Sequence, residues 1–71
     1  MALQERQQFL LAEMMFEMGL DMEQTLEILT IEDDVERMRW FVSQLKEMNY
    51  SATPEEVYDI AVESLLIYPD K

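Results

Sequence analysis

Apolar residues recur along this chain at intervals of three and four, the spacing of one face of an α-helix. The first stripe predicts a helix over residues 3–18, and Gly19 follows it as a residue that commonly ends a helix in the left-handed conformation. Asp21 and Gln24 form a capping-box pattern that starts a short second helix over residues 22–29. The two stripes consist of Leu3, Leu10, Leu11, Met14, Met15 and Met18, and of Met22, Leu26 and Leu29.

A third helix is predicted over residues 31–48, with Thr30 as its cap and acidic residues in its first turn. A fourth is predicted over residues 54–67, because Thr53, Pro54 and Glu56 match the pattern of a helix start. Its inward positions are Val57, Ile60, Ala61, Ser64 and Leu65, and those of the third helix are Ile31, Val35, Met38, Val42, Leu45 and Met48. With no strand-like alternation, the pattern predicts an all-α bundle of three longer helices and one short one, in a single domain over residues 1–71.

The composition adds a strong negative charge to this picture. Sixteen acidic and five basic residues give a net charge of −11 on 71 residues, and neither cysteine nor histidine is present. The lack of both removes disulfides, the usual zinc ligands and the usual general base. The Glu32–Asp34 run lacks the alternating ligands and central glycine of a calcium loop, and no phosphate loop or nucleophile motif is visible. We therefore expect no enzyme activity, no cofactor and no bound metal.

No apolar run approaches the roughly 20 residues that a membrane span needs, and the N-terminal residues do not resemble a signal peptide. We expect a cytoplasmic protein that does not bind membranes. An acidic surface repels nucleic acid and attracts basic protein surfaces, so the expected partner is a protein with a basic surface. The residues predicted to form the acidic patch that binds it are Glu32, Asp33, Asp34 and Glu36.

A second set of candidate residues is apolar: Phe16, Trp40, Phe41 and Met48, predicted to contact a partner or a second copy. Trp40 and Phe41 are adjacent, so both cannot face one helix seam; one is expected in the core and the other at a contact, with Tyr50 or Phe16. Met15 is a further candidate for an interface, since methionine adapts to varied surfaces. The number of large apolar residues exceeds what one small core needs, and this favours a homodimer.

Residues 19–35 resemble a helix-turn-helix domain. Apolar residues stand at the family's apolar positions, and Thr30 stands where the family usually has glycine. Those apolar residues are Leu20, Leu26, Leu29, Ile31 and Val35. The resemblance implies DNA binding through the second helix. Such binding would need dimerisation to gather Arg37, Arg39 and Lys46 into one positive strip. The first turns of that helix are acidic, however, and DNA would repel them.

Together these features favour a non-catalytic protein-binding module, a small intracellular regulator or adaptor that acts through its helix faces. The alternative is an acidic inhibitor whose carboxylates imitate a phosphate backbone and occupy the basic groove of a nucleic-acid enzyme. In size and charge the chain resembles such phage-encoded inhibitors, including anti-CRISPR proteins. A DNA-binding regulator of the helix-turn-helix class is the third hypothesis.

Overall fold

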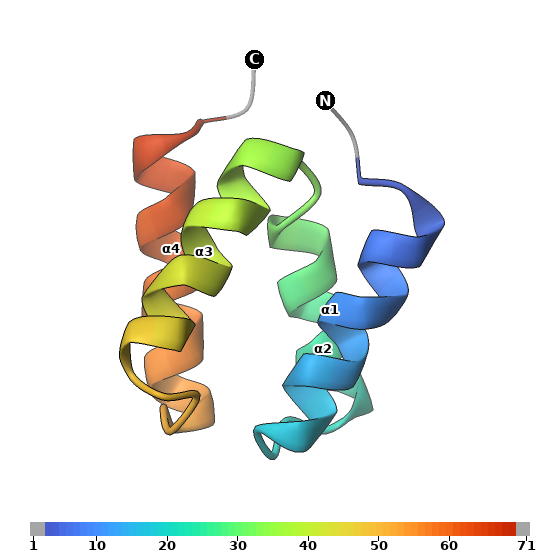
Figure 1. Cartoon of the computed structure of the whole chain (residues 1–71), viewed down its shortest axis with the longest axis vertical. Helices are drawn as coiled ribbons and strands as arrows, with labels where there is room; N and C mark the ends of the chain where they lie inside the picture. The colour runs from blue at the N-terminus through green and yellow to red at the C-terminus, as the bar shows by residue number, and fades with distance from the viewer. Residues whose placement is uncertain (1–2, 70–71) are drawn as a thin grey trace.

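The computed structural model describes residues 3–69, which form four helices and no strand. The helices are α1 (Glu5–Glu17), α2 (Met22–Ile31), α3 (Val35–Glu47) and α4 (Pro54–Ile67). They alternate in direction, so α1 and α2 form one hairpin, α3 and α4 form a second, and α2 packs beside α4 (Figure 1). The predicted all-α bundle is confirmed. No helix in this part of the chain has both the length and the apolar character needed to cross a membrane.

Local hydrogen bonds explain where three of the four elements begin or end. Asp21 accepts the backbone N–H of Gln24 at 2.8 Å, and the Gln24 side chain accepts the N–H of Asp21 at 3.0 Å. Thr53 and Glu56 make the same reciprocal pair at the start of α4. Gly19 has a φ of +94°, which lets the N–H of the next residue bond back to α1. These predicted caps are confirmed.

The predicted start of the third helix is wrong. The helix before it continues through Thr30, whose hydroxyl donates to the Leu26 carbonyl inside α2 at 2.9 Å. Asp34 caps α3 instead, because its carboxylate accepts the backbone N–H groups of both Glu36 and Arg37, at 3.0 and 3.3 Å. Residues 32–34 therefore form the link between α2 and α3.

The core collects one face of each helix. Its buried apolar members are Leu3, Leu11, Met15, Leu20, Ile28, Phe41, Leu45, Ala52, Val57 and Ala61. Met15, expected at an interface, has no exposed surface and lies in this core. Met22 and Leu26, expected to point inward, are more than half exposed, because α2 turns Thr25 and Ile28 to the core.

Arg37 is the largest fully buried side chain and joins three parts of the chain. Its Nε and Nη2 donate to the Tyr68 carbonyl at 2.8 and 2.6 Å, which fixes the end of α4 against α3. Its Nη1 donates to the Ile31 carbonyl and to Asp33, both at 2.8 Å, which fixes the end of α2. A buried guanidinium is stable here because its donors are matched by carbonyls and a carboxylate.

Candidate docking surface

The four residues of the predicted acidic patch do not share one exposed surface. Glu36 and Asp33 are exposed, although Asp33 is also held by the buried Arg37. Asp34 is half-buried and serves as the cap of α3. Glu32 has no exposed surface at all, so its assignment to a solvated patch is wrong.

Glu32 is buried because it follows α2 directly and turns toward α4, where Ser64 lies 2.6 Å from its Oε2. Its second oxygen, Oε1, has no hydrogen-bond partner. Burial disfavours the ionised form and raises the pKa of Glu32 from 4.5 to about 7, although the Ser64 hydrogen bond and Arg37 act in the opposite direction. The side chain is part of the helix packing.

Of the four apolar candidates, Phe41 is fully buried and therefore cannot contact a partner. It is the core member of the Trp40–Phe41 pair, because Arg37, Phe41 and Leu45 occupy successive turns of the buried face of α3. Trp40 and Met48 are half-buried, and Phe16 is 45% exposed. These three remain accessible in the monomer.

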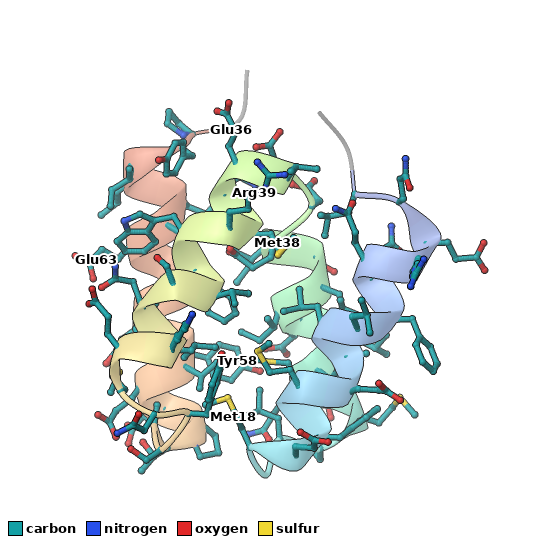
Figure 2. The ribbon with its side chains drawn as sticks, viewed as in Figure 1. Met18, Glu36, Met38, Arg39, Tyr58 and Glu63 are labelled. Carbon is teal, nitrogen blue, oxygen red and sulfur yellow. The ribbon has the colours of Figure 1, made fainter. Side chains whose placement is uncertain are left out.

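The structure brings together a group of residues that the sequence did not assign to one site. Four residues on one face of α1, the residue Met18 that ends this helix, and Tyr50 from the α3–α4 turn line an open groove of about 440 Å³, called here the α1 groove. Its lining residues are Leu10, Glu13, Met14, Glu17, Met18 and Tyr50. Met18 lies between the C-terminal end of α1 and the α3–α4 turn (Figure 2). The groove therefore spans the two helical hairpins.

The α1 groove combines an apolar floor with a negative edge. Leu10 and Tyr50 are 53% and 43% exposed, and Met14 and Met18 are half-buried against the core. Glu13 and Glu17 are both exposed and stand one helical turn apart on α1. Such a surface can bury apolar side chains of a partner while its two carboxylates attract adjacent cations.

A second, flatter hollow of similar volume lies where α3 meets the end of α4. It is lined by Glu36, Arg39, Trp40, Ser43 and Tyr68. It offers two half-buried aromatic rings, those of Trp40 and Tyr68, together with the oppositely charged side chains of Glu36 and Arg39, which lie near each other in Figure 2. This hollow has less apolar surface than the α1 groove and no consistent sign of charge.

Burial of one of the few cations makes the surface of the protein more negative. Arg37 is buried, so Arg6, Arg39 and Lys46 are the exposed cations of residues 3–69. Arg37 cannot join Arg39 and Lys46 in an exposed basic strip, as DNA binding by the helix-turn-helix segment would require. In the same part of the chain, no group of three or more acidic side chains is placed to hold a metal ion.

The α1 groove could be anticipated only in part. The sequence predicts Leu10, Met14 and Met18 on the inward stripe of the first helix, and Tyr50 as a contact residue. The prediction is wrong for Leu10, which is 53% exposed, whereas Met14 and Met18 pack against the core. The available signal was the width of that stripe, which exceeds the face that a helix in a two-layer bundle can bury. The position of Tyr50 beside α1 depends on tertiary packing and has no local signature.

Comparisons with known protein families, with curated proteins and with solved structures found no match for this chain.

Proposed function

We propose that this protein is a non-catalytic binding module whose α1 groove docks a basic, amphipathic helix of a partner protein. The observation that supports this most strongly is the pairing of exposed apolar residues with Glu13 and Glu17 along one face of α1. Helix-in-groove recognition uses apolar anchors one turn apart, and cations beside those anchors would meet the two carboxylates.

The charge of the whole chain favours the same kind of partner. At a net charge of −11, approach of an acidic protein is opposed, and approach of a basic one is accelerated. A second copy of this chain carries the same net charge of −11, so electrostatic attraction favours a basic partner over a second copy in the groove.

The proposal can be tested with a designed helix of about 18 residues that carries leucine on one face and lysine on both flanks. We expect it to bind, and binding to weaken as salt rises from about 50 to about 500 mM. The double reversal Glu13→Lys with Glu17→Lys should weaken binding at least tenfold, a loss of about 1.4 kcal/mol. If the unmodified protein binds the designed helix equally well at low and high salt, the role of Glu13 and Glu17 is contradicted.

A matched pair of substitutions on α4 controls for net charge. Asp59 and Glu63 are exposed, one turn apart, and Glu63 projects from the outer side of α4, away from α1 (Figure 2). Reversing both to lysine changes the net charge as much as reversing Glu13 and Glu17. If the two double variants weaken binding equally, the attraction belongs to the whole charge of the protein and not to the α1 groove.

The alternative function, an acidic imitation of a nucleic-acid backbone, is favoured by the excess of exposed carboxylates over the three exposed cations of residues 3–69. It predicts a basic nucleic-acid-binding partner, with no requirement for Leu10. Leu10→Ala should therefore weaken docking in the groove and leave an imitation mechanism unchanged. Leu66→Ala, on the outer face of α4, is the matched control for a lost apolar side chain.

Homodimerisation and a cytoplasmic location stay predictions from the sequence. Phe16, Trp40 and Met48 are accessible for self-association outside the α1 groove. The helix-turn-helix resemblance over residues 19–35 also stays a hypothesis, and its use for DNA binding is disfavoured by the burial of Arg37.

A further inference from the structure

A buried carboxyl group joins the end of α2 to α4. Glu32 is the first residue after α2, its backbone N–H still bonds to the Ile28 carbonyl at 2.8 Å, and its side chain reaches Ser64 in the last turns of α4. Both side chains have no exposed surface. Docking in the α1 groove does not use either residue, so their contact needs a separate explanation.

Counting protons at Ser64 shows which form of Glu32 this geometry fits. The Ser64 oxygen lies 2.6 Å from Glu32 Oε2 and 2.6 Å from the Ala61 carbonyl. The hydroxyl has one proton and can donate to only one of them. If Glu32 is ionised, one of these two short contacts joins two acceptors. If Glu32 is protonated, it donates to Ser64, Ser64 donates to Ala61, and both bonds are made.

The surroundings leave an ionised Glu32 poorly stabilised. Arg37 from α3 attracts it, but the Nε, Nη1 and Nη2 groups donate to the Tyr68 and Ile31 carbonyls and to Asp33. Asp33, next in the chain, repels it, and α4 offers the single Ser64 hydroxyl. Oε1 accepts no hydrogen bond, so a negative charge would be buried with one oxygen unpaired.

We propose that the protonated Glu32 carboxyl is a latch that holds the last turn of α2 and the 32–34 link against α4, and that loss of its proton releases them. Release lets water reach the carboxylate, which removes the cost of a buried charge. The contact between the end of α2 and α4 therefore depends on pH in the neutral range. It depends on Glu32 and Ser64, two residues that the sequence places in helices without any sign of this role.

The test is a titration of the Glu32 side-chain carboxyl carbon by nuclear magnetic resonance, with amide hydrogen exchange measured on the same samples. Glu32 should titrate near pH 7, well above its ordinary 4.5. If the pKa of Glu32 returns to 4.5 in the released state, the equilibrium constant for opening the last turn of α2 rises about 70-fold between pH 5 and pH 8. Exchange rates corrected for intrinsic pH dependence should show this rise at residues 30–32.

Glu32→Gln is the matched variant, because the amide can donate to Ser64 as a protonated carboxyl does and cannot ionise. Its exchange at residues 30–32 should stay constant over the same pH range. Titration of wild-type Glu32 near its ordinary value would overturn the proposal, and this result needs no variant. So would a neutral-range titration accompanied by no change in exchange, since the proton would then control no opening.

Discussion

Two buried ionisable side chains, Glu32 and Arg37, lie near the link between α2 and α3, and they differ in the hydrogen bonds that they make. The guanidinium of Arg37 donates hydrogen bonds to two carbonyl groups and to Asp33. Glu32 has one hydroxyl within reach and one unpaired oxygen, so its neutral form fits better. Neither side chain could be identified as buried from the sequence, because charged residues are usually exposed.

The first prediction concerns Glu32 and global stability. Its pKa is about 7 in the folded chain and 4.5 when unfolded, so the folded state binds more protons between these values. The free energy of unfolding therefore falls as pH rises through this range, by about 2 to 3 kcal/mol between pH 5 and pH 8. Glu32→Gln should lack this component, because the glutamine side chain cannot ionise. Urea unfolding at several pH values measures the difference, and parallel pH profiles would contradict it.

The second prediction concerns Arg37. Arg37→Ala leaves the carbonyls of Ile31 and Tyr68 without their donors and opens a cavity, so it should lower the free energy of unfolding by about 3 kcal/mol. Arg39→Ala removes the same side chain from an exposed position two residues away and should cost less than about 0.5 kcal/mol. Equal losses in thermal or urea unfolding would show that the Arg37 clamp contributes no special stability.

At the scale of helices, short-range chemistry decided most boundaries. The pairs Asp21–Gln24 and Thr53–Glu56 and the turn at Gly19 were all readable from the sequence, because each cap needs only residues within one turn. The α2–α3 boundary was misplaced because Thr30 and Asp34 are both suitable caps, and local preference could not choose between them. Burial of Ile28 and Glu32 against neighbouring helices extends α2 past Thr30.

A pair of alanine substitutions checks this assignment of the cap. Asp34→Ala removes the acceptor for two backbone N–H groups and should destabilise the protein by about 1 kcal/mol. Thr30→Ala, within α2, should change stability by less than about 0.5 kcal/mol. The reverse order in urea unfolding would place the start of the helix at Thr30 after all.

The same limit applies to which helix face is buried. For α4 the predicted inward residues Val57, Ala61 and Ser64 are buried. For α2 the prediction holds at Leu29, which packs against the core. It is wrong at Met22 and Leu26, which are apolar yet exposed, and it missed Thr25, which is polar yet buried. Helix periodicity gives the spacing of a stripe but not its direction when apolar residues occupy more than one side.

For the whole molecule, the exposed apolar residues favour self-association, whereas the net charge of −11 opposes it. Phe9, Phe16, Met22 and Leu26 are exposed on α1 and α2, helices that pack against each other. We predict self-association at about 100 μM, a concentration that corresponds to roughly 5 kcal/mol of association. Phe16→Ser should weaken it more than Leu66→Ser, as followed by sedimentation equilibrium. A wild-type monomer at this concentration would contradict the prediction.

Docking of a basic amphipathic helix in the α1 groove is tested most directly by chemical-shift mapping of the labelled protein during titration with the designed lysine–leucine helix. The largest changes should fall on Leu10, Glu13, Met14, Glu17, Met18 and Tyr50, and the outer face of α4 around Leu66 should stay unchanged. Changes centred on Asp33 and Glu36, or spread evenly over all four helices, would contradict docking in the α1 groove.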